Sequence, residues 1–301
     1  MIWQGSYDVI VVGAGAAGLS AALMLGRSKR TVLVIGSRTR RNSAVDAVHN
    51  IPFAEGTAPG ALYSKMEQDA VGYGVDLLWD EATSAKATDG QVVVRTANGT
   101  YQAATLLLAT GVADELPAWL PQEAWGRLAF DCPYCHTREL EGAPFVCVGE
   151  GVVTLEHALL AVQYTKDMTA VIADQAAADS DRAQRLRAAG GKVVVDTVVH
   201  AAELPSQELA LHTSGGTELT AGIVLLSGTK RPRTGLARQL GLALDADGAP
   251  VTSPFGRTSH PRVWNAGNVS DQYFMWTGAA SSGINAARSI SEELAYGAGR
   301  Q

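Results

Sequence analysis

Apolar runs along the chain are separated by glycine turns and by alanine-rich helical stretches. The β-branched run Val9–Val12 predicts a buried strand, the stretch that ends near Arg27 predicts a helix, and Thr31–Ile35 predicts a second strand. A strand, a glycine turn, a helix and a second strand in this order predict a βαβ unit with a parallel sheet.

A second unit of the same kind is predicted downstream. The apolar segment Phe145–Val148 predicts a strand that runs into the glycine turn Gly149–Gly151. A helical stretch over Leu155–Tyr164 and a strand at Ala170–Ala173 follow. The chain therefore contains two folds of the nucleotide-binding type.

The remaining segments complete this picture. Gln91–Arg95 leads into an Asn-Gly turn at 98–99, the dipeptide typical of a tight hairpin, and an apolar strand is predicted at Thr105–Leu108. Near the C-terminus, a strand at Val263 and a helix over Thr277–Tyr296 are too few to form a domain alone. We expect them to complete the first domain, so that the middle of the chain is an insertion.

The expected fold class is α/β, with two Rossmann-like, three-layer ββα nucleotide-binding domains, the second inserted in the first. Residues 1–117 and 245–301 form the discontinuous outer domain, and residues 118–244 form the inserted domain. A chain of 301 residues is long enough for two domains of ordinary size.

The first glycine turn carries the spacing of a dinucleotide fingerprint. In GAGAAG, Gly13 allows the tight turn, Gly15 lets the backbone approach a pyrophosphate, and Gly18 lets the helix pack close to the strand. The acidic residue that usually holds the ribose after the second strand is replaced by Gly36 and Ser37. We expect backbone groups or Ser37 to contact the ribose instead.

Composition narrows the class of function. Apolar types make up 47% of the residues and charged types 18%, which favours a large core over disorder. The net charge of -6 argues against nucleic-acid and polybasic membrane binding. The longest apolar window, Val9–Gly26, is interrupted by glycines, and the N-terminus lacks the features of a signal peptide. We expect a cytoplasmic protein without a membrane span.

Two of the three cysteines form a CxxC motif, Cys132 and Cys135, which indicates a redox pair at the start of a helix. Such a helix would favour the thiolate form. Asp131 and His136 flank the pair as candidate proton carriers, with His136 the better general base. A zinc site would need two further ligands and no second cysteine pair exists, so we expect no metal. Cys147 is expected to be a core residue.

The motifs together resemble those of the low-molecular-weight thioredoxin reductase family, the class II FAD-dependent pyridine nucleotide-disulfide oxidoreductases. They are GAGAAG at 13–18, LLLATG at 106–111, the CxxC, a second glycine turn, and AGNV at 266–269 before a final helix. The resemblance implies an outer domain that binds FAD, an inserted domain of the NADPH-binding type, and a homodimer. It also implies that Cys135 lies against the flavin and that Cys132 reacts with a small dithiol or disulfide, or with a thioredoxin-like protein.

The resemblance implies an FAD site built from both ends of the chain, in which the final helix directs its N-terminus at the flavin ring and Asn268 contacts the sugar-phosphate arm. The implied contacts are Gly13, Gly15, Ala16, Ala17, Gly18, Ser37, Arg41, Asn42, His49, Asn50, Ala109, Thr110, Gly111, Gly267, Asn268, Thr277, Gly278 and Ala279.

The sequence departs from the family where NADPH should bind. The second turn, Gly149-Glu150-Gly151, brings a negative charge, and Thr154 stands where a small residue should allow close packing. After the next strand, Asp174 occupies the place of a His-Arg-Arg cluster that would pair with the 2'-phosphate. We therefore expect NADPH binding to be weak or lost.

CPYCH at 132–136, Arg41-Asn42 with His49-Asn50 behind it, and AGN in place of AGD look more like a dithiol oxidase branch of this family. That branch uses FAD and O2 without NADPH. Two alternatives remain: a thioredoxin-disulfide reductase fed weakly by NADPH or by another donor such as ferredoxin, and a non-catalytic redox sensor. The roles of His49 and His136, the substrate and the direction of the reaction stay open.

Overall fold

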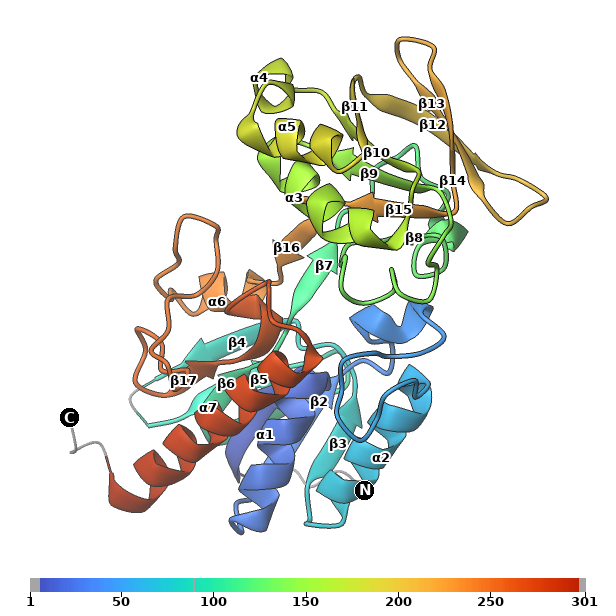
Figure 1. Cartoon of the computed structure of the whole chain (residues 1–301). Coiled ribbons are helices and arrows are strands. Elements are labelled where there is room, and N and C mark those ends of the chain that lie inside the picture. The colour runs from blue at the N-terminus through green and yellow to red at the C-terminus, as the bar shows by residue number, and fades with distance from the viewer. Residues whose placement is uncertain (1–5, 89, 298–301) are drawn as a thin grey trace. The chain divides into compact units, whose positions relative to one another are not determined.

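The computed structural model describes residues 6–88 and 90–297. Its contacts divide the chain into two compact units. Unit 1 comprises Met1–Ser43, Asn50–Ala113 and Lys230–Gln301, and unit 2 comprises Ala44–His49 and Asp114–Thr229. The middle of the chain is thus inserted between the segments of unit 1 (Figure 1).

Unit 1 is built on a seven-stranded sheet in the order β3-β2-β1-β6-β5-β4, with β17 paired to β6. Strands β3, β2, β1, β6 and β17 run parallel, whereas β4, β5 and β6 are joined antiparallel. The strands are β1 (Ser6–Val12), β2 (Val32–Gly36), β3 (Asp76–Trp79), β4 (Ser84–Ala87), β5 (Val92–Arg95), β6 (Thr100–Leu108) and β17 (Val263–Asn265). The predicted hairpin and parallel βαβ unit are both present.

The first strand shows why both faces of this sheet are covered. Val9 and Val11 point into one apolar core, and Ile10 and Val12 point into the other, because successive side chains alternate across a strand. The first core is closed by the helices α1 (Ala16–Arg27), α2 (Pro59–Val71) and α7 (Trp276–Tyr296). Helices α1 and α7 lie side by side (Figure 1), so close that a Cβ on Gly283 would lie 2.1 Å from the carbonyl oxygen of Ala17.

Unit 2 has three layers. Its parallel sheet, in the order β11-β10-β9-β15-β8, separates a helical layer from a three-stranded antiparallel sheet. The parallel strands are β8 (Ala129–Phe130), β9 (Phe145–Gly149), β10 (Met168–Ile172), β11 (Lys192–Val195) and β15 (Ile223–Leu226). The other elements are α3 (Gly151–Ala161), α4 (Gln175–Ala178), α5 (Asp181–Ala188), β12 (Val198–Glu203), β13 (Leu209–Thr213) and β14 (Glu218–Ala221). The predicted ββα layering is confirmed for unit 2.

Short elements occupy the connections. They are the strands β7 (Val112–Asp114) and β16 (Lys230–Pro232), the helix α6 (Gly235–Gln239), and the 3-10 turns η1 (Arg41–Ala44), η2 (Gln122–Ala124), η3 (Val162–Tyr164) and η4 (Gly267–Val269). Within the described part of the chain, no helix combines the length and the apolar character that a membrane span requires.

The unit boundaries differ from the expected domain limits. Unit 1 resumes at Lys230, earlier than the expected limit at 244/245, because Leu236, Ala237 and Leu242 are buried in its second core. The other limit falls after Ala113 rather than after 117, and residues 44–49 group with unit 2.

Candidate active site

The turn between β1 and α1 leaves a helix N-terminus open. Gly13 has φ +115, and a Cβ on it would lie 2.1 Å from the carbonyl oxygen of Ala109. A Cβ on Gly18 would lie 1.8 Å from the carbonyl oxygen of Gly13, so both positions require glycine. By contrast, no atom lies within 4 Å of a Cβ on Gly15, which caps α1 without a side-chain hydrogen bond. This open end suits a pyrophosphate, so the turn fits the dinucleotide arm of FAD.

The absence of an acidic residue at the end of β2, where one usually binds the ribose, has a steric cause. A Cβ on Gly36 would lie 2.7 Å from the main-chain nitrogen of Ala14, so the end of β2 excludes any side chain there. The hydroxyl of Ser37 accepts a hydrogen bond from the main-chain nitrogen of Thr39 at 3.0 Å. Ser37 therefore already stabilises the local turn.

The C-terminal part of unit 1 approaches the same turn. A Cβ on Gly267 would lie 2.8 Å from the Cβ of Ala17, and the main-chain nitrogen of Gly267 donates to the hydroxyl of Ser282 at 2.8 Å. Helix α7 has no side-chain cap, and its first turn contains the expected residues Thr277, Gly278 and Ala279. A second helix N-terminus without a side-chain cap thus belongs to the same unit, and its dipole again suits an anionic or electron-rich cofactor.

Arg41 and Asn42, two further expected FAD contacts of unit 1, lie in η1, whereas Asn50 and residues 109–111 lie in loops. Ala109 donates its main-chain N–H to the carbonyl of Val12 at 2.8 Å, directly after β6. Thr110 donates its hydroxyl to the carbonyl of Arg233 at 2.8 Å, and Gly111 follows. The main-chain nitrogen of Asn50 donates to the carboxylate of Glu55 at 2.8 Å.

Arg40 was not singled out in the sequence, yet it lies beside the glycine turn. Its Nε donates to the carbonyl of Ala14 at 3.2 Å, and its guanidinium pairs with Glu67 and lies 4.9 Å from the ring centroid of Tyr63. Burial raises the pKa of Tyr63, while hydrogen bonds from Trp276 and Asn42 and the charge of Arg40 act in the opposite direction. The sequence offers only the cluster Arg38, Arg40 and Arg41 as a signal, and this cluster does not distinguish Arg40 from the expected Arg41.

The CxxC motif is not at the start of a helix, contrary to expectation. Cys132 and Cys135 form a disulfide with a Cα–Cα distance of 5.5 Å, within a series of turns. Both cysteines are partly exposed, and the intervening Pro133 accepts a hydrogen bond from the hydroxyl of Thr137 at 2.6 Å. A turn has no aligned peptide dipoles, so the expected thiolate stabilisation by a helix N-terminus does not apply.

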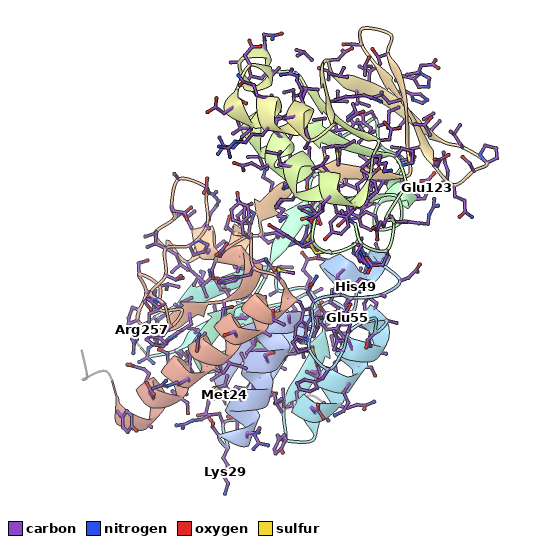
Figure 2. All side chains as sticks on the ribbon, in the orientation of Figure 1. Met24, Lys29, His49, Glu55, Glu123 and Arg257 are labelled. Atoms are coloured by element: carbon purple, nitrogen blue, oxygen red, sulfur yellow. A yellow bond between two sulfur atoms is a disulfide. The ribbon has the colours of Figure 1, made fainter. Side chains whose placement is uncertain are left out.

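His136 lies in a small cluster within unit 2. Its ring stacks on Phe130 with centroids 4.4 Å apart, and it meets the ring of His49 edge-on at 5.7 Å. His49, labelled in Figure 2, places Nδ1 3.6 Å from Oε1 of Glu139. Burial, and then the neighbouring His49, lower the pKa of His136, whereas Glu139 and Asp131 raise it. Phe130 and Glu139 were not predicted as site residues, because neither belongs to the motif.

His49 was expected among the FAD contacts. The structure groups it with unit 2, against His136 and Glu139, while its neighbour Asn50 belongs to unit 1.

The second glycine turn is built differently from the first. The hydroxyl of Thr154 lies 2.7 Å from that of Ser227 and donates to the carbonyl of Glu150 at 3.3 Å, and Thr154 is fully buried. Asp174 caps α4 by accepting the main-chain N–H of Ala176 at 2.9 Å. The nearby Arg182 pairs with Glu156 at 2.7 Å. The position where a His-Arg-Arg cluster for the 2'-phosphate was expected therefore carries the carboxylate of Asp174.

Cys147, the third cysteine, lies in β9 and is fully buried. Its sulfur is 3.9 Å from that of Met168, and burial raises the pKa of its thiol. It is a core residue, as expected.

Comparison with known proteins adds to this geometry. The family model described as pyridine nucleotide-disulphide oxidoreductase matches residues 7–283. The thioredoxin reductase sirT of Leptosphaeria maculans is 29% identical over 94% of this chain and 93% of its own length. The crystal structure of HlmI is 30% identical, with a TM-score of 0.87 over 98% of this chain and 94% of that one. An oxidoreductase from Agrobacterium tumefaciens is 26% identical, with a TM-score of 0.89 over 97% of this chain and 100% of that one.

Proposed function

The chain belongs to the pyridine nucleotide-disulphide oxidoreductase family, as a flavin-dependent oxidoreductase of the thioredoxin reductase type, and within that family we propose that it is an NADPH-independent dithiol oxidase. Its substrate would be a small dithiol, its cofactor FAD, and its final electron acceptor O2. The resemblance also implies a homodimer, and we propose a cytoplasmic location.

The observation that carries this proposal is the contrast between the two glycine turns. The first is open at Gly15, whereas the second has Glu150 at the helix start and an internal bond between Thr154 and Ser227. The carboxylate of Asp174 would repel a 2'-phosphate rather than bind it. A chain that keeps its FAD turn and its disulfide but has an altered NADPH turn needs electrons from another source, and a substrate dithiol supplies them.

The substrate would react at the disulfide. One substrate thiolate attacks a sulfur of the disulfide, forms a mixed disulfide with Cys132 and releases Cys135 as a thiolate. The second substrate thiol gives up its proton and closes the substrate disulfide, releasing Cys132. The substrate thereby loses two electrons and two protons, and the cysteine pair gains the two electrons.

His136 would hold the proton that the substrate thiol releases. Its ring is fixed by stacking on Phe130, and it directly follows Cys135 in the turn. Burial lowers the pKa of His136, which favours the neutral ring that can accept a proton, and the negative charges of Glu139 and Asp131 would stabilise the protonated ring after the transfer.

The two uncapped helix N-termini of unit 1 would hold FAD, with Gly13, Gly15 and Gly18 at the pyrophosphate and Gly267 and Asn268 at the sugar-phosphate arm. Bound FAD supplies a two-electron acceptor that can pass electrons to oxygen, so that the cysteine pair can return to the disulfide.

A second candidate is a thioredoxin-disulfide reductase, with a thioredoxin-like partner and either weak NADPH use or a donor such as ferredoxin. The names of the relatives favour it, since sirT and other curated relatives are called thioredoxin reductases. The same cysteine pair serves both directions, because the direction depends on the reduction potentials of the partners.

Anaerobic reduction of the flavin band distinguishes these candidates. NADPH is added to the purified holoenzyme in one cuvette and dithiothreitol in another. The oxidase predicts bleaching by the dithiol alone, reversed promptly when air enters. Prompt bleaching by NADPH would establish the reductase, and very slow reoxidation in air would favour a donor such as ferredoxin. A redox sensor would react once and show no steady-state turnover.

A further inference from the structure

Three side chains of unit 2 converge beside the redox turn. His49 comes from the segment 44–49, and His136 and Glu139 follow Cys135. One potential ligand atom from each residue lies within 4.8 Å of the other two, and Nδ1 of His49 is 3.6 Å from Oε1 of Glu139. We propose that His49, His136 and Glu139 form a binding site for a divalent transition-metal ion, with Zn²⁺ as the best match.

The donor set selects the metal. Two imidazole nitrogens and one carboxylate oxygen are the protein ligands of many zinc sites that keep a fourth position open. Mg²⁺ and Ca²⁺ prefer oxygen ligands throughout, so two histidines disfavour them. Bonds of about 2.0 to 2.2 Å place the ligand atoms of a tetrahedral site roughly 3.3 to 3.6 Å apart. The separation between His49 and Glu139 already falls near this range.

The surroundings favour a preformed site with access for the ion. The ring of His136 is held by its stack on Phe130, which is itself buried, so one ligand is fixed in place. Glu139 is exposed and can adjust its side chain to close the coordination sphere. The sequence predicts no metal because the CxxC pair lacks two further ligands. The site proposed here uses neither Cys132 nor Cys135.

A metal on His136 would occupy the lone pair that is proposed to take the substrate proton. Zn²⁺ would then inhibit dithiol oxidation reversibly. This consequence rests on the proposed function, but metal binding itself does not.

The test uses the oxidised full-length holoenzyme, in which the cysteine pair is locked as a disulfide and supplies no thiolate to zinc. Titration with Zn²⁺ in a calorimeter should show one ion bound per chain. His49→Gln and Glu139→Gln should each weaken binding by roughly tenfold or more, since even the residues that merely orient metal ligands are worth 10- to 100-fold. His200→Gln, a change at another histidine of unit 2, serves as the matched control and should bind zinc as the unchanged chain does.

Absence of saturable binding by the oxidised holoenzyme would overturn the proposal. So would binding that survives both ligand substitutions, or binding that His200→Gln weakens equally. Glu139→Gln changes an exposed side chain, so it remains informative if His49→Gln fails to fold. With free Zn²⁺ kept in excess of the dithiol, which itself chelates zinc, binding without inhibition of turnover would support the metal site and contradict the proton-accepting role of His136 instead.

Discussion

The side-chain amide of Asn268 donates a hydrogen bond to the main-chain carbonyl of Phe274 at 2.8 Å. The same nitrogen lies 3.3 Å and 3.4 Å from the carbonyl oxygens of Asp271 and Gln272. All three partners are acceptors, so this position needs a donor. The loop that leads into α7 is therefore held by a side chain that an aspartate could not replace in this arrangement.

Asn268→Asp should destabilise the protein more than Asn268→Ala does. Alanine removes a partly buried hydrogen bond, at a cost of about 1 to 3 kcal/mol, whereas a carboxylate adds repulsion from the carbonyl oxygens. Denaturant unfolding of the holoenzyme measures the free energies of all three chains. An aspartate variant as stable as the unchanged chain would show that the loop does not depend on the amide.

The hydrogen bonds of Asn268 explain why this chain has AGN, a feature that the sequence alone left undecided. AGN in place of AGD reads as a neutral exchange, because either residue can bond to a cofactor. Only the path of the loop back over η4 shows that three carbonyls face the side chain. Apolar runs and the glycine spacing predicted elements such as β1, α1 and α7, since these depend on local patterns, whereas α2 and the antiparallel sheet β12-β13-β14 were not predicted.

Relationships between distant segments were less accessible from the sequence. The helix expected at Cys132 rested on the usual context of a CxxC motif, but the structure has turns there. The cluster brings His49 to His136 and Glu139 from a distant part of the chain, and no spacing rule connects His49 to the other two. Likewise, the sequence shows only that Gly36 replaces the usual acidic residue. The structure shows why, because Gly36 lies so close to Ala14 that a side chain is excluded.

Removing the charges at the second glycine turn should improve NADPH binding. Asp174→Asn keeps a capping side chain for α4, because asparagine caps helices as well as aspartate does, yet it removes the negative charge. Combined with Glu150→Gln, it should raise the affinity for NADPH several-fold, measured by calorimetry, since two repulsions with the phosphates disappear.

NADH provides the internal control for that experiment. It lacks the 2'-phosphate, so the contribution of Asp174→Asn should be smaller for NADH than for NADPH. If the unchanged chain already binds NADPH as tightly as the double variant, the turn is not impaired and the oxidase proposal loses its main support.

Cys135→Ser should abolish reduction of the flavin by dithiothreitol under anaerobic conditions. The serine hydroxyl cannot form the disulfide that the substrate thiolate attacks. Cys147→Ala is the matched control, because Cys147 is buried in β9 and its raised pKa keeps it protonated. That variant should bleach at the rate of the unchanged chain, and bleaching that persists in Cys135→Ser would contradict the electron path.

The carboxylate of Asp196 should make unit 2 sensitive to acid. It accepts hydrogen bonds from the hydroxyl of Ser214 at 2.6 Å and from the main-chain nitrogens of Thr197 and Gly215, and these bonds lower its pKa to about 2. Because the folded pKa lies below the unfolded value of about 3.9, the contribution to stability is complete above pH 4 to 5. It is lost as the pH falls towards 2.

Thermal unfolding between pH 6 and pH 2 checks this linkage. The difference in Tm between the unchanged chain and Asp196→Asn should be largest near neutral pH and should shrink as the carboxylate is protonated. Asp46→Asn changes an exposed aspartate of the same unit and serves as the control. A Tm difference that does not vary with pH would show that the effect of Asp196 on stability does not depend on its ionisation, which would contradict the prediction.

Gly15→Ala and Gly18→Ala should fail in different ways, although both lie in one motif. A Cβ on Gly18 would collide with the carbonyl of Gly13 at 1.8 Å, so this variant should lose stability and yield little folded protein. A Cβ on Gly15 meets no protein atom within 4 Å, so Gly15→Ala should fold. Its added methyl group would instead occupy the space that we assign to the pyrophosphate of FAD.

The ratio of flavin to protein absorbance, measured together with thermal unfolding of the apoprotein, distinguishes the two effects. Full flavin content in Gly15→Ala would mean that the cofactor does not approach this turn as closely as proposed.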